Sequence, residues 1–164
     1  MKIAIRALIM LLVVLWLGGV MFFPVVAASA FGSISDTHIA GTIVAKCLRI
    51  LHYEGLFSGA LIVLLLLLAQ VMRALPRSVA APVVVTLIML GLTAYSQFSV
   101  IPRMERDRMA EGGAIHLTDR DNPNTVDFNR LHGVSEKVEQ GVLLGGIALV
   151  VLLSVGPKTA PAKI

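Results

Sequence analysis

The feature that most constrains this chain is a long apolar stretch near its N-terminus. Residues 7–31 contain no Asp, Glu, Lys, Arg or His. A helix needs about 20 consecutive apolar residues to cross the hydrocarbon core of a bilayer. Composition extends the argument to the whole chain, because 57% of its residues are hydrophobic and only 15% are charged, against about 25% in soluble domains. The sequence therefore predicts an integral membrane protein.

Hydropathy divides the chain into four apolar segments within a single membrane domain, residues 1–164. The predicted spans are residues 7–31, 55–73, 81–101 and 139–156, and the segments between them on one side are residues 32–54 and 102–138. The competing interpretation of the first span is a cleaved secretory signal, because Lys2 and Arg6 precede it and residues 28–30 resemble a cleavage site. The first apolar stretch is longer than the roughly 7 to 15 residues of a signal core, so a span is favoured.

Three of the predicted helices are longer than the bilayer is thick. Ser35 and Asp36 make a good N-cap and Pro76 is the next break, so one helix is expected from residue 37 to about residue 74. Pro102 is expected to kink the third helix, and the helix formers after it extend that helix. A loop is expected over residues 114–125, with the fourth helix starting at residue 126 or 127. The predicted fold class is all-α, a polytopic membrane four-helix bundle whose helices 2, 3 and 4 extend beyond the membrane on the non-cytoplasmic side.

Charge predicts the orientation. The segments on the side of the N-terminus contain basic residues and no acidic ones: Lys2, Arg6, Arg73, Arg77, Lys158 and Lys163. All 10 acidic residues are assigned to the opposite side. An excess of Lys and Arg marks the cytoplasmic side of a membrane protein. The sequence thus predicts a multi-pass protein of the cell (inner) membrane with both termini in the cytoplasm.

Few side chains of the sequence indicate a catalytic, binding or transport site. The sequence has no Ser/His/Asp grouping, no paired carboxylates and no glycine-rich phosphate loop, so no enzyme is predicted. Basic patches interleaved with aromatic residues are also absent, so no nucleic-acid partner is predicted. The predicted spans hold no Asp, Glu, Lys, Arg or His at membrane depth, which argues against ion-coupled transport. Thr86, Thr93 and Gln97 fall near one face of the third helix, where they are expected to fix packing through hydrogen bonds or to line a polar path.

Two histidines invite a cofactor hypothesis. His52 is expected to look into the bundle near the outer membrane boundary, and His132 flanks an apolar stripe on the fourth helix, so the two are expected to face each other. Imidazole is a common ligand of haem and of copper. Haem b or copper held by His52 and His132 is therefore one interpretation, and hydrogen-bonded structural histidines are the favoured one.

Small residues mark faces where helices can approach closely. The predicted packing glycines are Gly18 and Gly19, Gly55 and Gly59, and Gly141 and Gly145. Packing within the chain is favoured over packing between subunits. A mixed-sign cluster just outside the third span is expected to form a solvated, salt-bridged helix face; it consists of Arg103, Glu105, Arg106, Asp107 and Arg108.

Three segments together resemble a known family. They are residues 15–19 (Leu-Trp-Leu-Gly-Gly) with Phe22 and Phe23, residues 101–104 (Ile-Pro-Arg-Met) and residues 128–135 (Phe-Asn-Arg-Leu-His-Gly-Val-Ser). They resemble the uncharacterised four-span membrane proteins related to human transmembrane protein two-hundred-five, a domain of unknown function in bacteria. The resemblance implies a four-helix membrane bundle, a human member linked to platinum-drug resistance and no assigned catalytic residue. It directs attention to the motif residues Pro102, Arg103, Phe128, His132 and Ser135.

Three functional hypotheses follow. The leading one is a non-enzymatic structural or accessory subunit that contacts membrane lipid and binds other membrane subunits or itself. The alternative is a haem- or metal-binding membrane protein that serves in redox chemistry or in metal resistance. The third is a small-molecule or metal exporter, which needs a polar path past Thr86, Thr93, Gln97 and Gln70.

Overall fold

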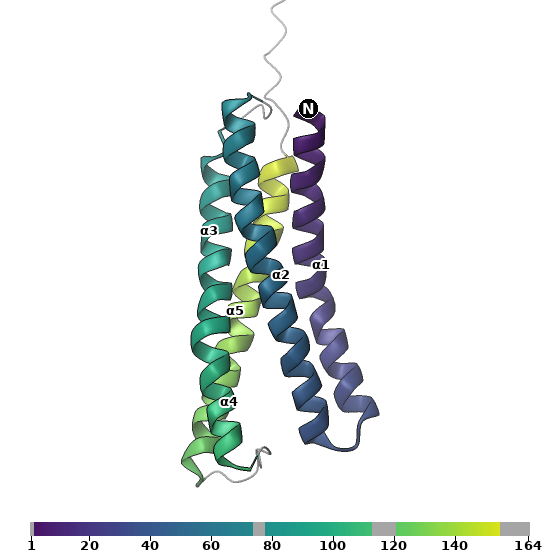
Figure 1. Ribbon diagram of the computed structural model, residues 1–164, viewed down its shortest axis with the longest axis vertical. Coiled ribbons are helices and arrows are strands. Elements are labelled where there is room, and N and C mark those ends of the chain that lie inside the picture. The colour runs from purple at the N-terminus through teal and green to yellow at the C-terminus, as the bar shows by residue number, and fades with distance from the viewer. Residues whose placement is uncertain (1, 74–77, 113–120, 155–164) are drawn as a thin grey trace, which may run out of the picture.

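The computed structural model describes residues 2–73, 78–112 and 121–154 (Figure 1). These residues form the helices α1 (Lys2–Ser33), α2 (Thr37–Val71), α3 (Ala80–Tyr95), α4 (Ile101–Ala110) and α5 (Pro123–Ser154), with a π-helical segment, η1 (Ser96–Val100), between α3 and α4. Because α3, η1 and α4 run on as one rod, the described residues contain four helices long and apolar enough to cross a membrane. The predicted all-α four-helix bundle is confirmed.

Side chains define where two of the helices begin. The Asp36 carboxylate accepts hydrogen bonds from the backbone N–H groups of His38 and Ile39 at the start of α2, as predicted for an N-cap. The Asn122 side chain accepts one from the Asn124 N–H, so α5 begins at Pro123, before the predicted start at residue 126 or 127. Proline is favoured in the first turn of a helix, because the backbone N–H groups there have no partner within the helix. The sequence analysis had placed Pro123 in the predicted loop.

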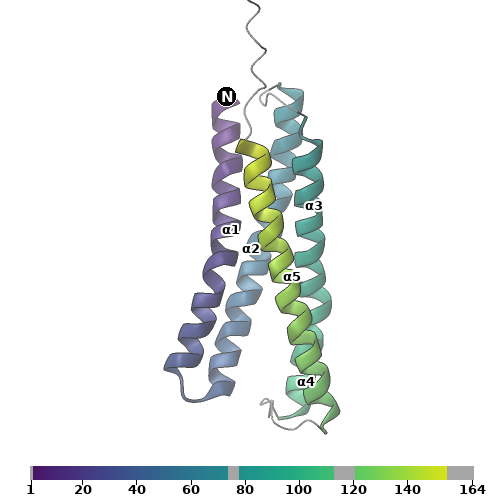
Figure 2. The same cartoon turned by 180° about the vertical axis from the view of Figure 1, so that it is seen from behind.

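The helices form an antiparallel bundle with two different ends (Figures 1 and 2). The end that holds Lys2, Arg6 and Arg73 is called the basic end, and the Lys2 ammonium donates to the Arg73 carbonyl at 3.4 Å there. The end that holds the α1–α2 turn and the start of α5 is called the polar end. Both views show the α1–α2 pair diverging from the α4–α5 pair toward the polar end.

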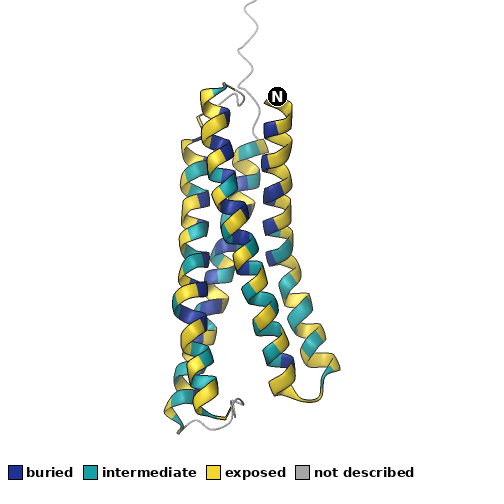
Figure 3. Cartoon of the chain, in the orientation of Figure 1, coloured by how far each residue is buried: buried dark blue, intermediate teal, exposed yellow. Residues whose placement is uncertain are grey.

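Core packing is concentrated toward the basic end (Figure 3). The buried residues of α1 all lie between Ile5 and Val20, and Trp16 is 2% exposed. Leu66 of α2 and Leu149 of α5 complete this core. Many large apolar side chains point outward instead, among them Phe57, Leu64, Ile88 and Leu144. Helices that are apolar on all sides are typical of membrane spans, where lipid covers the outer faces.

Candidate functional site

A polar cluster joins three helices near the middle of α2. The His52 side chain is buried, with Nδ1 3.1 Å from Oε1 of Gln97 in η1 and Nε2 2.6 Å from Oε1 of Glu139 in α5. Gln97 is buried as well, and Glu139 retains 18% of its side-chain exposure. We call His52, Gln97 and Glu139 the histidine cluster. It connects α2, η1 and α5 through side-chain hydrogen bonds alone.

The hydrogen bonds of the cluster determine its charge. Because an amide oxygen only accepts, Nδ1 of His52 carries the proton that is donated to Gln97 Oε1. One further proton then lies between Nε2 and the Glu139 carboxylate, and imidazolium–carboxylate and imidazole–carboxyl are the two ways of holding it. Both arrangements are neutral overall, which is the state that burial among apolar helices favours.

Glu139 is a partner of His52 that the sequence analysis did not identify. It is the first residue of the predicted span 139–156, and its side chain turns inward to His52. The sequence alone does not distinguish Glu139 from Glu136, which lies one turn earlier on the same helix and whose side chain is exposed. An ionisable group that faces the inside of a membrane bundle is by default a candidate functional residue.

The π-helix positions Gln97. The Ile101 N–H bonds to the Ser96 carbonyl, five residues back, and Pro102 follows immediately. Proline has no N–H to donate and its ring displaces the carbonyl four residues earlier, that of Phe98. The predicted kink at Pro102 therefore takes the form of a wider turn, with Ser96 and Gln97 both buried. Single π-helical turns are frequent at functional sites.

A second polar cluster connects α2 to α4 at the polar end. The Arg108 guanidinium donates to Thr42 Oγ1 at 2.7 Å and to both Glu105 oxygens, at 2.7 and 2.9 Å. Arg49 Nη2 lies 3.6 Å from Glu105 Oε2. The prediction of a solvated face holds for Arg103, which is exposed, whereas Arg108 reaches across to α2. We call Thr42, Arg49, Glu105 and Arg108 the arginine link.

The two predicted ligand histidines do not meet. The His132 side chain is 58% exposed, with Nε2 3.4 Å from Glu136 Oε1, and its ring stacks on Phe128 at 6.3 Å between centroids. The α5 residues that turn inward are its neighbours Leu131 and Ser135. At 3.6 residues per turn, a buried Leu131 directs the next side chain away from the bundle. Both ring nitrogens of His52 already have partners within the chain.

The other predicted residues lie as follows. Within the described residues, no group of three His, Cys, Asp or Glu is arranged to hold a metal ion. His38 is exposed, and His116 is outside the described residues. Of the family-motif residues, Pro102 and Arg103 are exposed and Ser135 is buried. Thr86 and Thr93 are buried on one side of α3, as predicted, and Thr86 Oγ1 donates to the Pro82 carbonyl at 2.8 Å.

Five of the six predicted packing glycines lie against another helix. A Cβ atom at Gly55 would come within 2.2 Å of Trp16 Nε1, and one at Gly145 within 2.7 Å of Met89. The same holds for Gly19 against Leu51, Gly59 against Trp16 and Leu90, and Gly141 against Leu92. Gly18 differs from the prediction, because a Cβ atom there would meet nothing within 4 Å. Gly146, which packs on Leu17, was missed because it lies outside the Gly-x-x-x-Gly pair.

Four helices of spanning length and a buried ionisable cluster between them define a multi-pass membrane protein. Residues 11–112 match the family described as a domain of unknown function, DUF4149, and the chain belongs to that family. No curated protein and no solved structure matches the chain significantly. The matched residues include His52 and Gln97 and end before Glu139.

Proposed function

We propose that this protein is a non-enzymatic accessory subunit of a membrane assembly, and that it binds a transmembrane helix of its partner through one face of α1. The observation that carries the proposal is an exposed stripe at helical spacing with Gly18 at its centre. The stripe consists of Leu11, Val14, Gly18, Met21 and Val25. Its large side chains are at least half exposed, and nothing lies over Gly18. A glycine in such a stripe allows a second helix to approach closely.

The level of the stripe along the bundle supports a protein partner. The polar-end part of α1 packs on α2, with Phe23 and Val26 lining the same hollow as Cys47 and Leu51. At that level α2 carries Lys46 and Arg49, whereas α1 stays apolar through Phe31. The Met21 and Val25 part of the stripe lies at this level, so a partner helix would there cover apolar side chains beside a charged part of α2.

Photocrosslinking tests the proposal. A benzophenone amino acid at Met21 is expected to give one discrete adduct in native membranes, and the same probe at Leu64 of α2 is the control, because Leu64 is equally exposed on a face without glycine. Gly18→Leu is expected to abolish the Met21 adduct, since the added side chain holds a partner helix away. If Met21 and Leu64 crosslink only to lipid, the proposal fails.

The proposed orientation places the basic end in the cytoplasm and the protein in the inner membrane. The support is the grouping of Lys2, Arg6 and Arg73 at one end of the bundle, where Lys2 bonds to the Arg73 carbonyl. In a Cys47→Ser background, a cysteine at Met109 is expected to react with a membrane-impermeant maleimide added to spheroplasts. A cysteine at Ser78 is expected to react only after lysis. The reverse pattern would invert the orientation.

A second candidate function, a proton-coupled exporter, is favoured by the histidine cluster. Transporters of this kind hold an ionisable group within the bundle, and His52 with Glu139 supplies one. If this function holds, deleting the gene raises the accumulation of an exported compound such as ethidium, a fluorescent organic cation. His52→Gln would then fail to restore export where the wild-type gene does. Unchanged accumulation across a panel of cationic and neutral dyes would exclude this candidate.

A further inference from the structure

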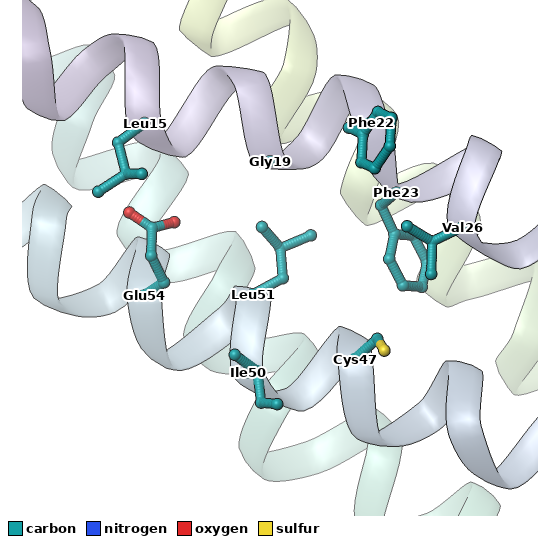
Figure 4. A pocket seen from close by; sticks show the side chains of 9 residues that line it. All are labelled: Leu15, Gly19, Phe22, Phe23, Val26, Cys47, Ile50, Leu51 and Glu54. Carbon is teal, nitrogen blue, oxygen red and sulfur yellow. The ribbon is translucent and has the colours of Figure 1, made fainter.

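A hollow between α1 and α2 is independent of both the histidine cluster and the exposed stripe. It has a volume of about 250 Å³ and an open side. Its lining is apolar except for one carboxylate (Figure 4), and consists of Leu15, Gly19, Phe22, Phe23, Val26, Cys47, Ile50, Leu51 and Glu54. We call this hollow the Glu54 groove.

The Glu54 carboxylate is only half satisfied. Its Oε1 accepts a hydrogen bond from Ser58 Oγ at 2.6 Å, whereas its Oε2 is buried without a hydrogen-bond partner in the described structure. Figure 4 shows the carboxylate directed from α2 toward Leu15 of α1. The nearest basic residue along α2, Arg49, pairs with Glu105 instead. A buried acceptor without a donor is costly, so this oxygen favours a ligand that donates a hydrogen bond to it.

Charge and size define the ligand. A cationic donor satisfies Oε2 and neutralises the carboxylate, whereas an anion is repelled and a hydrocarbon leaves the oxygen unpaired. The volume is below the roughly 300 Å³ at which drug-sized pockets begin, so the apolar part must be compact. We propose that the Glu54 groove binds a small lipophilic primary amine, with its apolar body against Phe23 and Leu51 and its ammonium group on the Glu54 carboxylate, which turns toward the groove to meet it.

Cys47 provides the readout. It is the only cysteine of the chain and lines the groove, where it is partly exposed. The full-length protein in lipid nanodiscs is labelled with N-ethylmaleimide, with and without phenethylamine. We expect the amine to slow the labelling of Cys47 in a saturable manner. Ethylbenzene has the same ring without a donor, and 2-phenylethanol has a donor without a charge, so both are expected to protect Cys47 less.

Glu54→Gln isolates the role of the carboxylate. This change keeps the size of the side chain and its acceptor for Ser58 and removes the charge. We expect it to raise the phenethylamine concentration for half-protection about tenfold, the effect of losing one charge-assisted hydrogen bond. Glu136→Gln is the matched control, because Glu136 is exposed on α5, and it is expected to leave the concentration unchanged.

Two measurements keep the test decisive. An unchanged Cys47 labelling rate without ligand and an unchanged emission of the single tryptophan, Trp16, will show that Glu54→Gln is folded at the α1–α2 contact. Absence of protection by phenethylamine would overturn the inference. Equal protection by phenethylamine and ethylbenzene, or equal protection of the wild type and Glu54→Gln, would also overturn it.

Discussion

The two halves of the bundle are held together by different interactions. Toward the basic end, Trp16 lies over Gly55 and Gly59, and side chains such as Leu66 fill the space between helices. Toward the polar end, α1 has no buried residue after Val20, and the described contacts between α2 and α4 are the side-chain bonds of the arginine link. The difference shows that close packing joins the helices of one half, whereas in the other half α4 packs on α5 and a few directional polar contacts link this pair to α2.

The largest expected effect lies between the halves, at the histidine cluster. His52→Leu leaves the largely buried Glu139 side chain without its partner. Removing one member of a buried ion pair costs about 3–5 kcal/mol, so we expect a loss of this size in the free energy of unfolding, measured in mixed micelles. In the double variant His52→Leu/Glu139→Leu, much of the loss should be recovered. A double variant as unstable as the single one would contradict the pairing.

The basic-end packing predicts the next largest effect. Gly55→Ala places a methyl group where the Trp16 indole lies. Overpacking of this kind costs about 1–3 kcal/mol, and the emission of Trp16 should shift as the ring is displaced. Gly18→Ala is the control, because nothing lies within 4 Å of the added atom. Similar losses in the two variants would mean that the α1–α2 contact is looser than described.

The arginine link predicts a smaller and local effect. Arg108→Met removes the bonds to Thr42 and Glu105. We expect a loss of about 1 kcal/mol, since the cluster is partly solvated. Hydrogen exchange should accelerate in α4 and in the first turns of α2, and remain unchanged around Ile62. Arg103→Met is the exposed control. Faster exchange throughout the bundle would contradict the division into two halves.

Asp107 predicts the smallest effect. Burial and the nearby Asp127 carboxylate raise the pKa of Asp107, and the guanidinium groups of Arg106 and Arg130 partly offset this. A raised pKa in the folded state means that the ionised carboxylate costs stability at neutral pH, and that this cost disappears as the pH falls through the folded pKa. Asp107→Asn should therefore stabilise the protein at pH 7, by less than about 0.5 kcal/mol. A stability difference from the wild type that stays constant on acidification would contradict this assignment.

The sequence predicted the parts of the fold that follow from local chemistry. Hydropathy identified the four helices, and Asp36 was recognised as a cap because Asp is a preferred residue at the position before a helix. Helical periodicity placed His52 inside the bundle, but it could not identify Glu139 as the partner, since that depends on the relative heights of α2 and α5. Because these relative heights were unknown, the sequence analysis also paired His52 with His132, whose side chain points outward.

The π-helix changes the direction in which the side chains of α4 point. A turn whose bonded groups are five positions apart accommodates one residue more than an α-helical turn, and one residue corresponds to about 100° of rotation around the axis. The side chains of α4 are therefore rotated relative to those of α3, and it is this phase that directs Arg108 at Thr42. Deleting one residue within η1 would change this phase and turn the charged face of α4 away from α2.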